Sequence, residues 1–191
     1  DQNVPGFGVT FLLLGMLMGV GLGLADEREW GMLYRLSASP VSTSALVTGK
    51  VISRCIIGVL QMLILFVFGH LVFVVSLGRS WLLLGLVVAA VSFAASSLGL
   101  LVAALAPSRD AVLPLGTIAI MGMAAIGGCW WPITIEPHWL QTVAHLFPTA
   151  WAMEAFNDLM LREGQLKDIL PALGALTTFG VLYWILGLKV L

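Results

Sequence analysis

Long apolar segments alternate with short polar ones along the 191 residues of the chain. An α-helix needs about 20 predominantly apolar residues to cross the hydrocarbon core of a bilayer, because it rises only about 1.5 Å per residue. Five segments approach or exceed this length, and each predicts one transmembrane helix. They are Gly6 to Ala25, Val51 to Leu77, Trp81 to Ala106, Ala111 to Pro132 and Ile169 to Leu188.

The composition supports a membrane protein. Hydrophobic residues make up 60% of the chain and charged residues 10%, and the mean hydropathy is +1.04. So much apolar surface cannot be buried inside one water-soluble core of this size. The sequence therefore predicts a single all-α, polytopic membrane domain over residues 1–191. Its net charge of −1 and its lack of a basic patch give no reason to expect a nucleic-acid partner.

The positions of lysine and arginine predict the orientation. Basic residues concentrate in cytoplasmic loops close to span ends. If the loop after the first span is cytoplasmic, that side carries six basic residues and the outer side three. These are Arg28, Arg35, Lys50, Arg54, Arg109 and Lys189 against Arg79, Arg162 and Lys167.

A charged stretch follows the first apolar run without a gap. Each charge near the bilayer centre costs roughly 2.5 to 3.5 kcal/mol, so the chain is expected to leave the membrane at Asp26. Asp26 would cap a new amphipathic helix whose N-terminal dipole favours Glu27 and Glu29. Glu29 falls within the apolar arc of this helix, so we expect it to contact a neighbouring span or another chain. The arc consists of Trp30, Leu33, Tyr34 and Leu36.

The stretch "SASPVSTS" should end that helix. Ser39 before Pro40 suits a new N-cap followed by proline at the first helical position. A second short helix is therefore expected to lead into the span at Val51. Residues 26–50 would form a compact cytoplasmic element between two spans.

The sequence lacks the features of several transporter and enzyme classes. No Asp or Glu lies inside a predicted span, which argues against a channel or proton-driven transporter. The segment Thr48 to Val51, "TGKV", does not complete a Walker loop. Upstream, Ser44 stands where the first glycine is needed, and Val51 stands where Ser or Thr is needed. No metal-binding set of Cys and His is expected either. Energy for active transport would have to come from a separate ATPase.

One alternative remains open in the outer loop. His138 and His145 lie near Glu136 and Glu154 in the sequence, as an acid/base pair would require. A membrane enzyme or scaffold that uses these residues is the second hypothesis. Ordinary solvation of loop residues is the simpler interpretation.

The segment 128–168 is unusual for a connecting loop. It is rich in tryptophan, which favours the headgroup layer, and prolines interrupt it. We expect a broken, partly re-entrant outer segment and then a helix from Thr149 to Glu163 in the outer interface. Candidate outer-gate or substrate-contact residues are Trp130, Trp131, Glu154 and Asp158.

Small residues recur every fourth position in two spans. Such ridges allow close approach of helix backbones in membranes, within one chain or between two copies. Packing within one chain is the more common use. The ridges are Gly15, Gly19 and Gly23 in the first span, and Ala95, Gly99 and Ala103 in the third.

Two segments resemble a known family. "DEREWGMLYRLSASPVSTSALVTGK" is similar to the cytoplasmic loop of ABC transporter type-2 permeases, in which an acidic-Arg-acidic cluster, a glycine, "RL", a "SPVS"-like turn and "GK" occur in this order. "FPTAWAMEAFNDLM" resembles the outer segment before that family's last span. Met32 departs from the threonine common after the glycine. The five predicted spans would be the last five of the family's six.

The resemblance implies a function and a set of partners. A permease of this family works as a homo- or heterodimer in the bacterial inner membrane and rests on cytoplasmic ATPase subunits through a coupling helix. The ATPase holds ATP and Mg²⁺, so this chain would bind no cofactor. Alternating access would export a drug, lipid or polysaccharide. The implied coupling residues are Glu27, Arg28, Glu29, Gly31, Arg35, Ser39 and Pro40.

Overall fold

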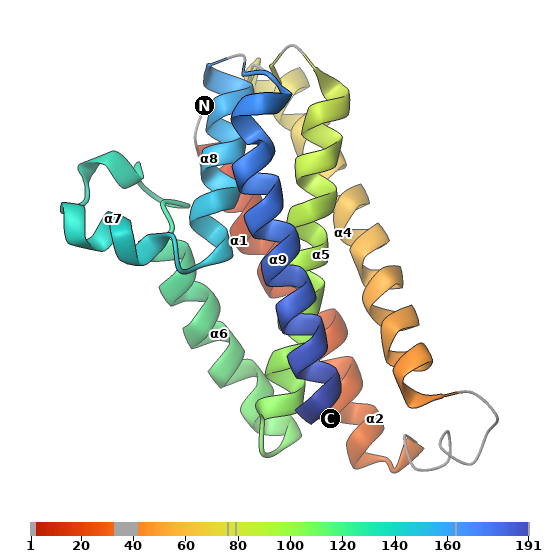
Figure 1. Cartoon of the computed structure of the whole chain (residues 1–191). Helices are drawn as coiled ribbons and strands as arrows, with labels where there is room; N and C mark the ends of the chain where they lie inside the picture. Colours follow the sequence, from red (N-terminus) through yellow and green to blue (C-terminus); the bar gives the residue numbers. More distant parts are fainter. Residues whose placement is uncertain (1–2, 33–41, 76, 79, 163, 191) are drawn as a thin grey trace.

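A computed structural model describes residues 3–32, 42–75, 77–78, 80–162 and 164–190. This part of the chain contains α-helices, one π-helix and one 3₁₀ helix, and no strand. Five of its helical segments are long and apolar enough to cross a membrane. They form an elongated bundle, with a smaller helical segment projecting from one side (Figure 1). The all-α membrane fold expected from the sequence is confirmed.

The first span consists of three consecutive helical segments. Helix α1 (Asn3–Met16) passes into the π-helix η1 (Leu17–Leu22) and then into α2 (Gly23–Glu29). A π-helix inside an α-helix is rare and often lies at a functional site. The sequence predicted that Asp26 would cap a new helix, and this is wrong. Asp26 lies within α2, and no proline interrupts the hydrogen bonding of that helix. The acidic cluster occupies the C-terminal end of the first span.

The second span is one helix, α4 (Thr43–Phe73). Ser42 caps it, since its side-chain oxygen accepts a hydrogen bond from the backbone N–H of Ala45 at 3.4 Å. The expected separate short helix before Val51 is therefore wrong from Thr43 onward, because the helix continues unbroken into the span. At the other end, Val74 adopts a left-handed conformation with φ 53°. Helix α4 ends four residues before the predicted Leu77.

Helix α5 (Trp81–Leu105) is the centre of the bundle. It packs along α9 (Leu166–Val190) and also contacts α4 and η1. Gly99 lies so close to the first span that an added Cβ would be 2.8 Å from the carbonyl oxygen of Met16. Small residues on α5 thus permit direct helix contact.

The fourth span, α6 (Arg109–Ile126), is followed by the outer segment. Gly127 and Gly128 end the helix six residues before the predicted Pro132, with Gly128 at φ 76°. The short helices η2 (Ile133–Ile135) and α7 (His138–Ala144) come next, and then α8 (Pro148–Leu161). This segment is broken as expected; a re-entrant path through a membrane remains a prediction.

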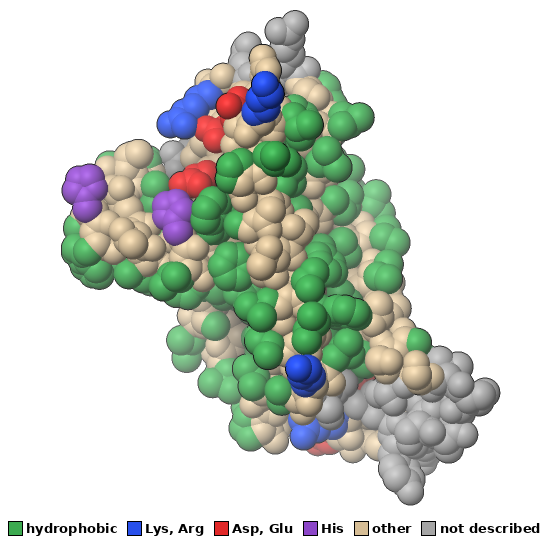
Figure 2. Space-filling model, viewed as in Figure 1, with side chains coloured by type: hydrophobic (Ala, Val, Ile, Leu, Met, Phe, Trp, Pro, Cys, Tyr) green, Lys and Arg blue, Asp and Glu red, His purple; other side chains and the backbone are tan. Residues whose placement is uncertain are grey.

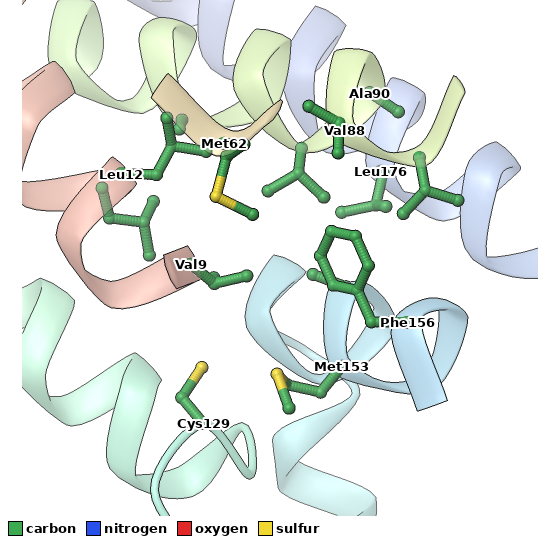
Figure 3. Packing of buried hydrophobic residues seen from close by; sticks show 14 of the residues in the cluster. Val9, Leu12, Met62, Val88, Ala90, Cys129, Met153, Phe156 and Leu176 are labelled. Atoms are coloured by element: carbon green, nitrogen blue, oxygen red, sulfur yellow. The ribbon is translucent and has the colours of Figure 1, made fainter. Parts of the chain in front are cut away.

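Helix α8 does not lie flat across the end of the bundle, as an interfacial helix would. It runs alongside α9 in the opposite direction (Figure 1). The reason is its apolar face, which is buried against the bundle, with Phe156 0% exposed. The rings of Phe156 and Phe66 meet edge to face at a centroid distance of 5.3 Å. Figure 3 shows Phe156 and Met153 of α8 among the buried side chains of the core.

Charged side chains on the face shown in Figure 2 gather towards the two ends of the bundle, with apolar side chains between them. Lys167 and Asp168 begin α9, and Lys189 lies in its last turn. Charged side chains at both ends and apolar side chains between them are typical of a helical bundle that crosses a bilayer.

Candidate functional site

Three helix ends meet at the end of the bundle that the sequence predicts to be cytoplasmic. The end of α2 meets the beginning of α6, and α4 passes beside α2. Arg109 Nε of α6 donates to Asp26 Oδ1, and Lys50 Nζ of α4 pairs with Glu27 Oε2. Both acids lie where the negative end of a helix dipole disfavours them, so the two cations offset an unfavourable placement. The pairs tie the first span to two others.

A cavity of about 380 Å³ opens beside these pairs. The end of α2 and the connection between α5 and α6 form its walls. Arg28 and Glu29 are exposed and make no ion pair with another described residue, and the Asp110 side chain is 93% exposed. The cavity therefore offers charged groups of both signs to a partner. It is lined by Ala25, Arg28, Glu29, Ala103, Ala106, Pro107, Ser108, Arg109 and Asp110.

The predicted coupling residues are only partly described. Glu27, Arg28 and Glu29 lie in the last turn of α2, and Glu27 is the one engaged in an ion pair. Gly31 follows with φ 65°, a left-handed conformation that glycine adopts readily. Arg35, Ser39 and Pro40 lie outside the described residues.

The small-residue ridges have different surroundings. A Cβ added to Gly15 would lie 3.4 Å from Gln61 Oε1, and one added to Gly19 would lie 2.9 Å from Arg54 Nη1. Gly23 has nothing within 4 Å. In α5, by contrast, Ala95 and Ala103 are buried and Gly99 packs on the first span. The ridge in α5 thus serves contacts within the chain.

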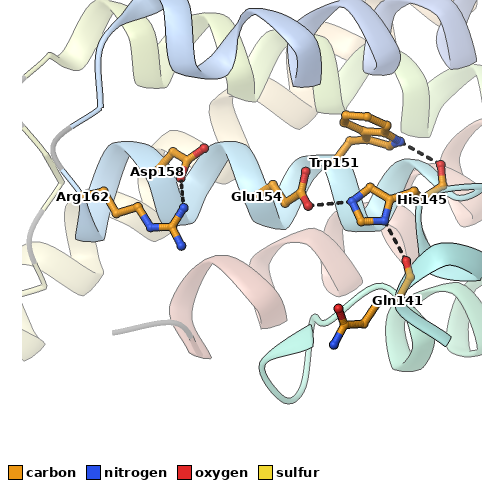
Figure 4. A network of polar contacts seen from close by, with 6 residues as sticks. All are labelled: Gln141, His145, Trp151, Glu154, Asp158 and Arg162. Atoms are coloured by element: carbon orange, nitrogen blue, oxygen red, sulfur yellow. Dashed lines mark hydrogen bonds and ion pairs between the residues drawn. The ribbon is translucent and has the colours of Figure 1, made fainter. Parts of the chain in front are cut away.

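The outer segment holds a network of hydrogen bonds centred on His145 (Figure 4). His145 Nδ1 lies 2.7 Å from the carbonyl oxygen of Gln141, and Nε2 lies 2.6 Å from Glu154 Oε1. Trp151 Nε1 donates to the carbonyl oxygen of His145 at 2.8 Å. The network joins the end of α7 to the first turns of α8.

The protonation of His145 follows from its neighbours. A carbonyl oxygen only accepts hydrogen bonds, so Nδ1 carries a proton and donates it to Gln141. Partial burial lowers the pKa of His145, but the hydrogen bonds to Gln141 and Glu154 and the charge of Glu154 outweigh that effect and raise its pKa above the usual 6.5. The raised pKa favours an imidazolium paired with the Glu154 carboxylate.

The other outer candidates do not share one site. Trp131 Nε1 donates to Glu136 Oε1 at 2.7 Å, while Trp130 packs edge to face on Trp131. Both indoles are partly exposed. Asp158 instead accepts a hydrogen bond from Arg162 Nη1 at 2.8 Å, one turn further along α8. Of the four predicted residues, Glu154 alone joins the His145 network.

Sequence reasoning missed the π-helix and the pairing of charges across helix ends. Glycine is dense in "GMLMGVGLG", and this was the available signal for irregular helical hydrogen bonding. In the predicted orientation, Lys50 and Arg109 lie on the same side of the membrane as the acidic cluster. Which cation meets which acid depends on helix packing, so their positions in the sequence do not reveal it.

The five long apolar helices and the charged helix ends define a multi-pass membrane protein. Residues 1–189 match the family described as ABC-2 family transporter protein. The chain belongs to this family, that of the ABC type-2 permeases.

Individual relatives agree with this assignment. The linearmycin resistance permease protein LnrN of Bacillus subtilis (strain 168) is 29% identical over 190 residues, which are 100% of this chain and 49% of that protein. The probable multidrug ABC transporter permease YbhR of Escherichia coli (strain K12) is 22% identical over 166 residues, 87% of this chain and 45% of YbhR. The chain thus spans about half the length of these curated relatives.

Proposed function

We propose that the chain is the membrane part of an ATP-driven exporter in a bacterial inner membrane. A separate cytoplasmic ATPase would bind ATP and Mg²⁺ and move the spans, and a second permease copy would complete the path. The cavity beside Arg28 and Glu29 carries the proposal. Its exposed charges face outward, while Asp26 and Glu27 in the same turn are tied to two other spans.

Transmission of force requires a rigid connection, and the structure supports one. An ATPase element that engages Glu29 would push on the end of α2, which continues without a break into the first span. The pairs from Asp26 to Arg109 and from Glu27 to Lys50 would pass the movement to α6 and α4. Alternating access then needs only small relative movements of packed helices.

The proposed cargo is a drug, a lipid or a polysaccharide. Two relatives are described as a linearmycin resistance permease and a probable multidrug permease. Their descriptions favour a drug-like cargo over a lipid or a polysaccharide. Movement of α8 against α9 would open the outer end of the path.

The His145 and Glu154 contact is the observation that favours an enzyme instead. However, Gln141 and Glu154 already engage both ring nitrogens, so the imidazole offers neither nitrogen to a substrate in this conformation. We therefore propose that the pair fastens the outer segment to α8. Substrate turnover that depends on His145 would support the enzyme hypothesis.

The test is co-purification and transport with the charge-reversal variant Glu29→Lys. The full-length permease, expressed with its neighbouring genes and isolated in mild detergent, should bring down an ATPase subunit. Glu29→Lys should weaken this association and uncouple ATP hydrolysis from export without preventing membrane insertion. Lys167→Glu, an exposed charge reversal at the opposite end, is the matched control.

Two outcomes would count against the proposal. Normal association and export by Glu29→Lys would show that the cavity is not the coupling surface. The absence of any ATPase partner from the purified permease would remove the exporter function itself.

A further inference from the structure

A second groove, distinct from the coupling cavity, lies between the first span and α4. It encloses about 400 Å³. The π-helix and α2 form one wall, and the first turns of α4 form the other. The lining residues are Gly19, Val20, Gly23, Leu24, Glu27, Leu46, Gly49, Lys50, Ser53 and Arg54.

The groove carries one positive charge in excess. Lys50 pairs with Glu27 inside it. Arg54 has no acidic partner among the residues that the structure describes, and its guanidinium lies against Gly19, where an added Cβ would be 2.9 Å from Nη1. The Ser53 hydroxyl adds a donor at the same rim. Two cations and a hydroxyl against one carboxylate favour an anionic ligand.

The position of Arg54 along α4 narrows the choice of anion. Arg54 is four residues, or about 6 Å, further into the span than Lys50. An unpaired charge at such a position is costly unless it reaches water or a counter-ion at the membrane surface. A phosphate held at the level of the headgroups would supply the counter-ion, and a guanidinium matches its geometry with two parallel hydrogen bonds.

The surface next to the groove is mainly apolar. On the same side of α4 as Arg54, Ile57 and Ile64 are 46% and 69% exposed. With the exposed Gln61 between them, they form a mainly apolar stripe that leads from the guanidinium towards the middle of the span. A free phosphate ion has no apolar surface that could cover such a stripe, whereas the acyl chains of a lipid would cover it.

We propose that this groove binds the phosphate headgroup of an anionic glycerophospholipid from the cytoplasmic leaflet. Arg54 and Lys50 would hold the phosphate, and Ser53 would donate to it. Basic pockets between transmembrane helices on this side of a membrane commonly hold such headgroups. The groove shares no lining residue with the coupling cavity, although its Glu27–Lys50 pair is the one proposed to link α2 to α4. Lipid binding there does not depend on the exporter hypothesis.

The experiment is native mass spectrometry of the purified full-length permease in equimolar phosphatidylglycerol and phosphatidylcholine. The wild-type protein should retain phosphatidylglycerol preferentially. Arg54→Gln should lower this retention by about tenfold or more, since one charge-assisted hydrogen bond is worth about a factor of ten and the guanidinium can make two. Gly19→Leu should do the same, because its side chain takes the space of the Arg54 guanidinium.

Controls separate binding from folding and lipid from free anion. Arg162→Gln removes an exposed arginine at the opposite end and should leave retention unchanged. Arg54→Lys keeps the charge and should retain more lipid than Arg54→Gln. Such a difference would show that the charge is needed for binding, and that misfolding is not the cause of the loss in Arg54→Gln. Soluble glycerol phosphate should not displace the bound lipid.

Three results would overturn the proposal. They are equal retention of the two lipids, an unchanged preference in Arg54→Gln, and full displacement by glycerol phosphate, which would assign the groove to a soluble anion. A crosslink from Ser53→Cys to another polypeptide segment would also contradict the proposal, because it would show that protein and not lipid occupies the groove.

Discussion

The two ends of the bundle fix their connecting segments by different interactions. At the cytoplasmic end, partly exposed ion pairs join helix ends, as between Lys50 and Glu27. At the outer end, α8 is fixed by buried apolar packing and by hydrogen bonds to backbone carbonyls, such as that from Thr149 Oγ1 to the Met123 carbonyl oxygen at 2.7 Å. Salt weakens partly exposed ion pairs, whereas it has little effect on buried close packing. The contacts at the predicted cytoplasmic end should therefore depend on ionic strength, and those of α8 on the fit of its buried face.

The largest effect is expected from removing a fully buried aromatic side chain of α8. Phe156→Ala deletes a ring that is 0% exposed and lies against Phe66. Substitutions of this kind leave a cavity and cost about 3 kcal/mol or more. Thermal unfolding of the purified protein, followed by intrinsic fluorescence, should show a clear decrease in midpoint.

A control on the same helix tests the cause. Leu161 is 51% exposed at the end of α8, so Leu161→Ala should change the midpoint little. Equal destabilisation by both variants would show that α8 is not anchored by its buried face. The contrast between the two ends of the bundle would then fail.

A smaller, salt-dependent effect is expected at the cytoplasmic end. Lys50→Gln and Glu27→Gln each break a pair whose side chains are 35% and 22% exposed. Partly exposed pairs of this kind are worth about 1 kcal/mol or less, and salt weakens them. In a double-mutant cycle measured by thermal unfolding, the coupling should fall as ionic strength rises, while the Phe156→Ala effect should not. A salt-independent coupling would place the pair with the rigid outer contacts.

The sequence predicted the spans well because the requirement for about 20 apolar residues depends on composition alone. It also predicted a helix from Thr149 to Glu163, close to the observed Pro148–Leu161 of α8. The role of Asp26 was predicted wrongly. A capping residue after an apolar run is typical of a new helix, but a helix that keeps its hydrogen bonding has no need of a cap.

The contacts within the candidate sites depended on tertiary structure. Arg109 and Asp26 are 83 positions apart and meet only because α6 returns to the end of α2. The contact between His145 and Glu154 depends on the turn before Pro148, which brings the end of α7 beside α8. Sequence spacing named most of these residues as candidates without pairing them correctly.

The smallest effect concerns pH at the outer end. The pKa of His145 is raised above 6.5 in the folded protein, as its hydrogen bonds to Gln141 and Glu154 outweigh partial burial. The stabilisation is therefore fully present below the unfolded pKa of about 6.5 and is lost as pH rises through the higher folded value. Hydrogen exchange of α7 and the start of α8 should be slower at about pH 6 than at about pH 8.5, after correction for the intrinsic pH dependence of exchange.

Two histidine variants separate this effect from general titration. His145→Gln should abolish the corrected pH difference, because glutamine remains neutral over this range. His138→Gln replaces an exposed histidine at the beginning of α7 and should leave it unchanged. Faster exchange at low pH would reverse the sign worked out from the pKa of His145. A difference that persists in His145→Gln would assign the titration to another group. Either result would remove the charge of His145 from the interactions that fix the outer end, and leave its buried packing and backbone hydrogen bonds.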